Sequence, residues 1–297
     1  MQRVRHKAFA APHSNASVAG SGNAGLFVRP SVCAALLSPV RRILAVALLL
    51  CAVPAAHAAT TGLVDGGSAE VASVVDGDTI ALKDGSQVRL VGIQAPKLPL
   101  GRPDFPAWPL GEDAKEALER LVAGKSVDMR YGGARRDRHG RHLAQLYTPD
   151  GTWVQGALLA AGFARVYSFP DNRAVVGEML ALEGQARAHR RGIWSDPFYR
   201  VLTPDEAARH LDTFQLVEGK VQNVAVVRGR AYLNFGADWR TDFTIAIEPG
   251  DMRAFRDAGL DPRKLEGRRV RVRGWLKSMN GPMIQATHPE QIEILSP

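Results

Sequence analysis

Cysteine is almost absent from this chain of 297 residues, and its two cysteines, Cys33 and Cys51, both lie near the N-terminus. Both fall within residues 1–58, a segment with the features of a cleaved export signal. The chain that remains after cleavage would contain no thiol. That excludes disulfide bonds, a cysteine nucleophile and a cysteine-ligated zinc site from the mature protein.

Acidic residues are missing from the same N-terminal segment. Residues 1–58 hold six basic residues and no aspartate or glutamate. The whole chain has a formal net charge of +8, from 38 basic and 30 acidic residues. Without the six, 32 basic residues face 30 acidic ones, which leaves a net charge of only +2. The overall charge of the mature chain therefore indicates no polyanionic partner, and only local clusters of basic residues could do so.

The hydrophobic run at residues 43–53 has 11 residues, too few to span a membrane as a helix. It follows Arg41 and Arg42 and precedes Ala56-His57-Ala58, the order of a secretory signal with a long basic region in front. We expect cleavage after Ala58, a periplasmic or secreted protein, and no membrane association afterwards. A membrane anchor or a buried helix is the alternative interpretation of this run.

Residues 69–196 show strand and helix patterns in close succession. Glycine-containing turns at Asp76-Gly77-Asp78 and Asp84-Gly85 separate the first three strands. The periodicity predicts strands at 70–75, 79–82, 88–93, 127–131 and 142–147, and helices at 111–122, 154–161 and 172–191. Three short strands, a helix and two more strands favour a small five-stranded barrel such as the OB-fold.

Residues 197–212, which include Pro197 and Pro204, have the composition of a linker. The same order of elements then recurs in residues 213–297. Strands are predicted at 215–227, 231–235, 243–247, 269–276 and near 284 or 292–295, with a helix at 251–258. The sequence therefore predicts a mainly β protein of the α+β class, in which a second small OB-like β-barrel follows the first.

Several motifs within residues 70–196 occur in series. They are Val75-Asp76-Gly77-Asp78-Thr79-Ile80, Arg89-Leu90-Val91-Gly92-Ile93 with Pro96, Gly111-Glu112 with Ala114, and Asp137-Arg138-His139-Gly140-Arg141. In this order they resemble the staphylococcal nuclease (thermonuclease) family. The resemblance implies an OB-type barrel with helices packed beneath it.

The resemblance also implies a site for phosphodiester hydrolysis. In that family, two aspartates and a backbone carbonyl hold one calcium ion, a glutamate acts as general base, and two arginines bind the phosphate. Asp78 matches the first calcium-binding aspartate, and Arg89 and Arg141 match the two arginines. The second aspartate position is Gln94, and the general-base position is Lys97.

These two substitutions weaken the half of the site that holds the metal. Gln94 still offers a carbonyl oxygen but no charge, and the ammonium of Lys97 would repel a nearby divalent ion. A nearby acid, Asp104, Glu112 or Asp113, could replace the missing one. However, Glu112 and Asp113 stand at the start of a predicted helix, where acids are favoured without any catalytic role.

A second group of basic residues lies in the C-terminal half. The alternation Arg269-Val270-Arg271-Val272-Arg273 places its arginines on one face of a strand, with Trp275 two positions further along. Basic and aromatic side chains on one sheet face could bind a single strand of nucleic acid by charge and stacking. A solvated sheet face above an aromatic core is the alternative.

These features together predict an exported thermonuclease-family protein that acts on the phosphodiesters of single-stranded DNA or RNA. Two alternatives remain open: a nucleic-acid-binding protein without hydrolysis, and a cell-envelope module that binds another anionic polymer. The sequence leaves open whether the protein is an enzyme. It also leaves open whether calcium binds at the altered site.

Overall fold

The computed structural model describes residues 62–296. The predicted signal segment lies outside them, so export stays a prediction. No helix within the described residues is long and apolar enough to cross a membrane.

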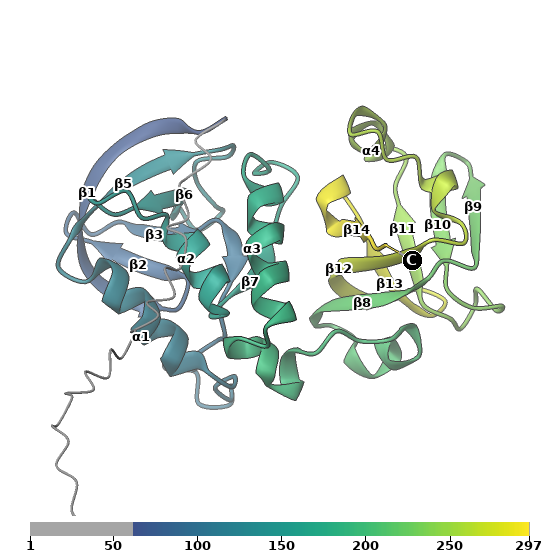
Figure 1. Cartoon of the computed structure of the whole chain (residues 1–297), viewed down its shortest axis with the longest axis horizontal. Helices are drawn as coiled ribbons and strands as arrows, with labels where there is room; N and C mark the ends of the chain where they lie inside the picture. The colour runs from purple at the N-terminus through teal and green to yellow at the C-terminus, as the bar shows by residue number, and fades with distance from the viewer. Residues whose placement is uncertain (1–61, 297) are drawn as a thin grey trace, which may run out of the picture. The chain divides into compact units, whose positions relative to one another are not determined.

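Five strands close into a barrel in the order β1-β2-β3-β6-β5 (Figure 1). They are β1 (Val64–Asp76), β2 (Thr79–Leu82), β3 (Gln87–Leu90), β5 (Ser126–Tyr131) and β6 (His142–Tyr147). β3 and β6 run parallel, and the other pairs are antiparallel. Alternate residues such as Val88 and Leu90 point into the barrel and are fully buried. The predicted five-stranded barrel is confirmed.

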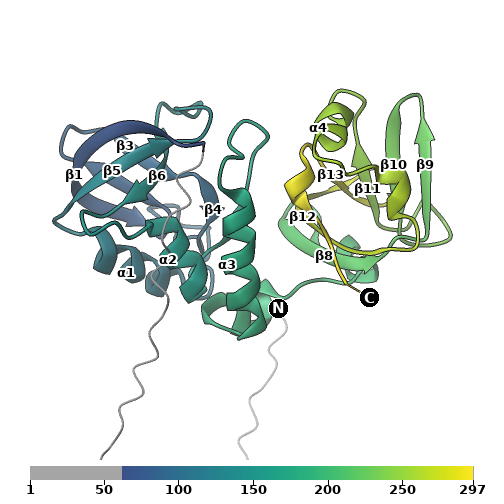
Figure 2. The ribbon, with the colours of Figure 1, turned by 45° about the horizontal axis from the view of Figure 1, so that its top comes forward.

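Three helices belong to this part of the chain; the first two lie beneath the barrel strands in Figure 2, and the third packs beside the second. They are α1 (Gly111–Val122), α2 (Val154–Ala161) and α3 (Val176–Ala188). The first two have the predicted bounds, and α3 is shorter than the predicted 172–191. A separate two-stranded ribbon pairs β4 (Gly92–Gln94) with β7 (Arg165–Tyr167). The single strand predicted at 88–93 is therefore divided between β3 in the barrel and β4 in this ribbon.

Short 3-10 helices occupy Gly192–Ser195, Pro197–Tyr199 and Pro204–His210. The predicted linker is therefore structured, with Tyr199 buried. Ile193 and Trp194 from this segment share an apolar cluster with Phe214 of the following strand. The division of the chain into domains at residues 69, 197 and 213 stays a prediction.

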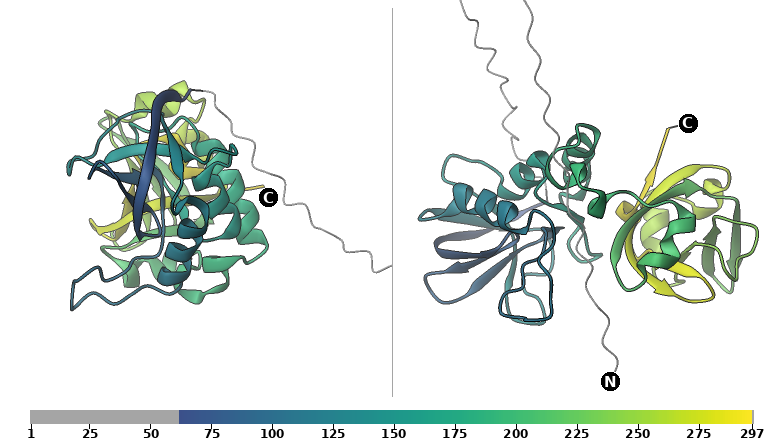
Figure 3. Two further views of the ribbon diagram at one scale, coloured as in Figure 1. Left: turned by 90° about the vertical axis from the view of Figure 1, so that its left-hand side faces the viewer. Right: turned by 90° about the horizontal axis from the view of Figure 1, so that it is seen from below.

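A seven-stranded sheet forms the C-terminal part, seen from further directions in Figure 3. Its strands are β8 (Phe214–Lys220), β9 (Asn223–Val227), β10 (Arg230–Asn234), β11 (Thr244–Ile247), β12 (Arg269–Ser278), β13 (Pro282–Gln285) and β14 (Ile292–Ile294), with α4 at Met252–Asp257. The single strand predicted at 215–227 is two strands. The chain changes partner between them, because the N–H of Val221 donates to Arg268 before β12 and the N–H of Gln222 donates to Asn234 of β10. The order is β14-β12-β13-β11-β10-β9 with β8 beside β12, so a second OB-like barrel is not confirmed.

Candidate functional site

The turn between β1 and β2 places a carboxylate inside the protein. Gly77 is needed in this turn, because a Cβ atom there would lie 2.7 Å from that of Ala95 and 2.9 Å from that of Ala114. The next residue, Asp78, is fully buried at 0% exposure. The backbone N–H of Ala95 donates to its carboxylate at 2.8 Å. A buried charge of this kind is stable only with cationic partners.

Lys97 and Arg89 are those partners. Lys97 Nζ lies 2.9 Å from Oδ1 and 2.7 Å from Oδ2 of Asp78, and Arg89 Nη2 lies 3.2 Å from Oδ2. Burial by itself would raise the pKa of Asp78, but the two cations lower that pKa to about 2. Asp76 lies 3.6 Å from Lys97, and burial together with the nearby Asp78 raises its pKa. Two carboxylates, Asp76 and Asp78, and two cations, Lys97 and Arg89, therefore form one closed cluster, here called the acid cluster.

Arg89, on β3, uses much of its guanidinium to hold the surrounding backbone. Nη1 donates to the carbonyl oxygens of Asp78 and Leu90 at 3.2 and 2.8 Å, and Nη2 donates to that of Ile93 at 2.7 Å. Its side chain keeps 13% of its surface exposed. The predicted contact with phosphate stays a prediction, and stabilisation of the β3–β4 turn is an additional role for this residue.

Gln94 bonds through its side chain to a buried arginine, Arg165, and not to the acid cluster. Its side-chain oxygen accepts hydrogen bonds from Nε and Nη2 of Arg165 at 2.9 and 2.7 Å. Burial lowers the pKa of Arg165 to about 10. The rings of Trp108 and Phe214 lie 5.9 and 4.8 Å from its guanidinium carbon. Gln94 thus anchors a cation that follows it by 71 residues.

An open pocket of about 560 Å³ lies beside Arg89. Its walls are the turn from β3 to β4, the loop between β5 and β6, and the segment that follows β7. Arg141 also lines it, with Nε and Nη2 at 2.8 and 2.7 Å from Oδ2 of Asp137. The structure therefore brings the two predicted phosphate-binding arginines to one pocket, which we call the basic pocket.

The loop at residues 135–141, here the basic loop, adds charge that the sequence analysis did not assign. Arg136 and Arg138 both line the basic pocket. Arg136 Nη1 donates to the Gly140 carbonyl at 2.7 Å, and Arg138 Nε donates to Nε2 of His139 at 3.1 Å. Within residues 62–296 neither arginine pairs with a carboxylate. The density of arginines in this loop was the available sequence signal.

Aromatic side chains form the opposite wall of the basic pocket. Tyr167 comes from β7, and Phe169 follows it with 43% of its surface exposed. Their rings meet edge to face with centroids 4.9 Å apart. The pocket thus combines guanidinium groups with an exposed flat ring, the two kinds of group that hold a phosphate and a base.

Comparison with known proteins agrees with this arrangement. The family described as "Staphylococcal nuclease homologue" matches residues 87–196. The chain is 38% identical over 129 residues to an "Uncharacterized endonuclease" of Escherichia coli, and the match covers 42% of this chain and 76% of that protein. The chain belongs to the staphylococcal nuclease family.

Two further relatives in the staphylococcal nuclease family have related names. The chain is 29% identical over 130 residues to a "Thermonuclease" of Staphylococcus hyicus, covering 43% of this chain and 75% of that protein. It is 34% identical over 130 residues to "Endonuclease YncB" of Bacillus subtilis, covering 42% and 60%. The matched segment of the family includes Arg89, Gln94, Lys97 and Arg141.

The calcium ion that the staphylococcal nuclease family implies does not fit the residues present. Both carboxylate oxygens of Asp78 are bonded to Lys97, and the oxygen of Gln94 is bonded to Arg165. Within residues 62–296, no group of three or more His, Cys, Asp or Glu side chains could hold a metal ion. Calcium ordinarily takes about six to eight oxygen ligands.

The three acids considered as replacements lie elsewhere. Asp104, Glu112 and Asp113 are all exposed, and the latter two occupy the first turn of α1. Within the described part of the chain, none forms a hydrogen bond or ion pair with Asp78 or Lys97. Their places agree with the helix-dipole interpretation of Glu112 and Asp113.

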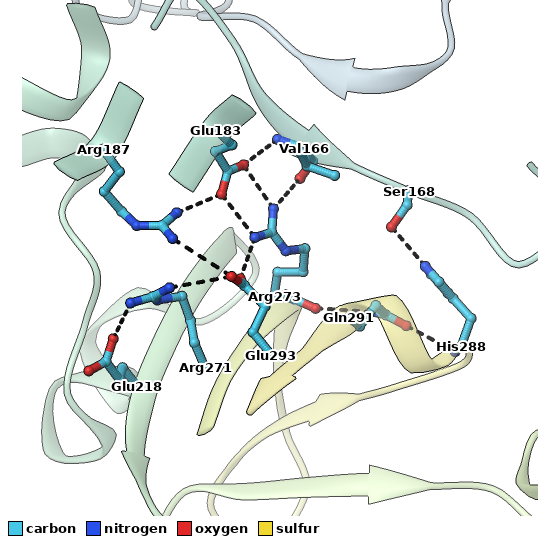
Figure 4. A network of polar contacts seen from close by, with 10 residues as sticks. All are labelled: Val166, Ser168, Glu183, Arg187, Glu218, Arg271, Arg273, His288, Gln291 and Glu293. Carbon is cyan, nitrogen blue, oxygen red and sulfur yellow. Dashed lines mark hydrogen bonds and ion pairs between the residues drawn. The ribbon is translucent and has the colours of Figure 1, made fainter. Parts of the chain in front are cut away.

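The basic face predicted in the C-terminal half is neutralised by acids (Figure 4). Arg269 and Arg271 on β12 both pair with Glu218, at 2.8 and 2.5 Å. Arg271 also lies 3.4 Å from Glu293. Trp275 is 45% exposed, and its Nε1 donates to the hydroxyl of Tyr167 at 2.9 Å. Nucleic-acid binding by Arg269, Arg271 and Trp275 stays a prediction.

Arg273 is buried rather than on an open face, so its predicted contact with nucleic acid has no support in the structure and stays a prediction. It is 1% exposed and lies 2.9 Å from both carboxylate oxygens of Glu183 on α3. It also lies 2.6 Å from Glu293 on β14. Burial of Glu183 would raise its pKa, yet Arg273 and Arg187 lower it. Alternation placed Arg273 on the same face as Arg269 and Arg271, but Glu183 of α3 packs against it there, while Arg269 and Trp275 stay exposed (Figure 4).

Proposed function

We propose that this chain is an exported protein that binds the phosphodiesters of single-stranded nucleic acid in its basic pocket. The observation that carries the proposal is the convergence of Arg89, Arg141 and the basic loop on a pocket with an exposed aromatic wall. The export part rests on the signal-like pattern of residues 1–58.

The chemistry of the basic pocket suits a single strand. Arg136 and Arg138 have no carboxylate partner within residues 62–296, so their guanidinium groups can pair with phosphate oxygens without first breaking an ion pair. Phe169 offers a ring on which an unpaired base can stack. A duplex, whose bases are already stacked on each other, would gain less from this ring.

Binding in this proposal needs no calcium, because Lys97 already neutralises the carboxylate of Asp78 that a calcium ion would otherwise neutralise. Relative to the acids of the family, Gln94 removes one negative charge and Lys97 changes the charge by two. The site is therefore more positive by three charges, which exceeds the two charges of a calcium ion. A bound phosphate would experience an attractive field without any metal.

Hydrolysis is the second candidate function, and one observation favours it besides the endonuclease names of the relatives. His139 lines the basic pocket, and its Nε2 accepts a hydrogen bond from Arg138. Nε2 could take a proton from an attacking nucleophile once the hydrogen bond from Arg138 is released. Lys97 stands at the general-base position of the family, and its ammonium has no free electron pair for that role.

The test is the binding and cleavage of a labelled oligothymidylate by the purified protein, with chelator and with calcium. The proposal expects binding in chelator, weaker binding to duplex, and a strong dependence on salt. Release of acid-soluble fragments in chelator would establish the second candidate. Binding that appears only with calcium would contradict the proposal. Equal affinity for an anionic polysaccharide of similar charge density would favour the envelope-module alternative.

A further inference from the structure

A second hollow, of about 380 Å³, lies on the outer face of the C-terminal sheet. Strands β9, β10, β11 and β13 form its floor, at the right of Figure 1. Trp239 from the loop after β10 and Met279 with Asn280 from the turn before β13 form its rim. It belongs to a part of the chain that the match to the nuclease family does not include.

The register of the strands builds the floor of this hollow. Asn223 lies opposite Asn234, Asn234 opposite Thr244, and Thr244 opposite Met283. One row across the sheet therefore consists mainly of amide and hydroxyl groups. In the next row Ala225 lies opposite Tyr232, and this small side chain leaves space beside the tyrosine ring. The hollow is thus a product of side-chain size and strand pairing.

Large apolar side chains around the hollow are unusually exposed. Trp239 is 50% exposed, Met279 is 53% exposed and Val227 is 55% exposed. All three line the same hollow. On the other face of the same sheet, Leu233 of β10 and Ile245 of β11 are fully buried in the core. Apolar surface gathered at one concave place is typical of a binding site rather than of scattered surface residues.

None of the described residues that line the hollow is charged. Arg240 lies 4.6 Å from the Trp239 ring, and Arg230 is held by Glu248, with Nε and Oε2 2.8 Å apart. A nucleic-acid strand would bring one phosphate with each base, but the residues that line the hollow include no cation, and Arg240 beside it is paired with Asp238 at 3.8 Å. The floor instead offers hydrogen bonds from neutral groups, for example around Asn234 and Thr244, which bond to each other at 3.2 Å.

We propose that this hollow binds a neutral sugar ring of a glycan. The apolar C–H face of the sugar would pack on Trp239 and Tyr232, and its hydroxyls would bond to the row that contains Asn223 and Asn234. The volume falls in the range of small-ligand sites, about 300–1,000 Å³. This inference is independent of nucleic-acid binding in the basic pocket.

The experiment is a screen of the purified protein on an array of neutral glycans, followed by titration of the best glycan by protein NMR. We expect saturable shifts at residues 223–234 and 279–283, and affinity lowered about tenfold or more by Trp239→Ala. Phe198→Ala is the matched control, because Phe198 is also 50% exposed but does not line the hollow. It should leave the glycan affinity within about twofold.

Three outcomes would overturn the proposal. One is that no glycan on the array binds the wild-type protein more strongly than it binds the Trp239→Ala variant. Another is equal loss of affinity in the Phe198→Ala control. The third is displacement of the glycan by free thymidine or adenosine at lower concentration, which would make the hollow a nucleobase site. Failure of oligothymidylate binding would not affect the inference, since that result concerns the basic pocket.

Discussion

The chain carries two clusters of arginines in opposite surroundings. In the basic loop, Arg136 and Arg138 bond to a carbonyl and a histidine and have no carboxylate partner within residues 62–296. On β12, Arg271 and Arg273 are each shared between two glutamates from other elements. The same residue type therefore either stays available to an outside anion or joins separate elements of the protein together. The position of the acids decides between these roles.

The free-energy consequences of the two clusters differ in kind. Removal of an exposed cation from the basic loop leaves its former neighbours in contact with water, so folding is hardly affected. Removal of a buried cation leaves a buried carboxylate without its partner, and water cannot replace that partner. The basic loop should therefore control binding, and the β12 cluster should control stability.

The largest effect is expected for Arg273→Ala. Glu183 is fully buried and would keep only Arg187 and the backbone N–H of Val166 as partners. We expect a loss of about 3–5 kcal/mol in the free energy of unfolding, measured by urea denaturation. Arg138→Ala, the matched control in the basic loop, should change it by less than about 0.5 kcal/mol. Equal losses in the two variants would remove the distinction between the clusters.

The opposite ranking should hold for nucleic-acid binding. We expect the double variant Arg136→Ala, Arg138→Ala to weaken oligothymidylate binding by about 2–3 kcal/mol, since two solvent-exposed contacts of about 1–1.5 kcal/mol each are lost. The slope of log affinity against log salt should fall by about 1.4, or about 0.7 for each lost phosphate contact to a single strand. Fluorescence anisotropy between about 50 and 200 mM salt measures both quantities.

Arg269→Ala is the control for the binding experiment. Arg269 is an exposed arginine on β12 whose charge is shared with Glu218. The variant should bind oligothymidylate within about twofold of wild type. If it lost as much affinity as the basic-loop variant, the face of β12 would be a nucleic-acid site after all, and the basic pocket would not be the only one.

Much of the first barrel was predictable because its signals are local. The turn at Asp76-Gly77-Asp78 and the apolar faces of α1 and α2 depend on residues within a few positions of each other. The alternation along β12 likewise identified which side chains share a face. Such patterns fix an element and its orientation, but they do not name the element that packs against it.

The contacts that were missed join residues far apart in the sequence. Glu183 and Arg273 are 90 positions apart, and Gln94 and Arg165 are 71 apart. In a single sequence nothing marks such pairs. The direct bond between Lys97 and Asp78 was missed for another reason, because the resemblance to the family treated position 97 as a lost base rather than as a cation for the buried acid.

Acidification should weaken the contact beside the β12 cluster between Ser168, which follows β7, and His288, which precedes β14. His288 is buried, and its Nε2 lies 2.8 Å from the hydroxyl of Ser168. Burial lowers its pKa to about 4, with Arg173 and Arg273 acting in the same direction and Glu290 and Asp171 opposing them. The unfolded chain therefore binds more protons between about pH 6.5 and 4, so this contribution is present above that window and is lost as the pH falls through it.

The expected size of this loss is about 2 kcal/mol between pH 7 and pH 5. Urea denaturation at both values measures it, and His288→Gln should remove most of the difference. His142 also has a pKa lowered by burial, but it is present in both proteins and cancels in the comparison. A pH dependence that is the same in wild type and His288→Gln would contradict the assignment to this side chain.

The smallest effect is expected at Lys97, the cation that closes the cluster around Asp78. In the wild-type protein Lys97 already occupies both carboxylate oxygens, so calcium at about 10 mM should not change the thermal midpoint measurably. Lys97→Gln removes the ammonium and leaves the carboxylates of Asp76 and Asp78 facing a neutral amide. A weak site with a dissociation constant of about 2 mM would then add about 1 kcal/mol of calcium-dependent stability.

Differential scanning fluorimetry with calcium, magnesium and chelator measures this response within each protein, so the cost of the substitution itself cancels. Lys115→Gln, a lysine on α1 that pairs with Glu119 instead, should show no calcium response. A calcium-dependent gain in the wild-type protein equal to that of Lys97→Gln would mean that the ion displaces the lysine, and the arginines of the basic pocket would then act beside a metal rather than in its place.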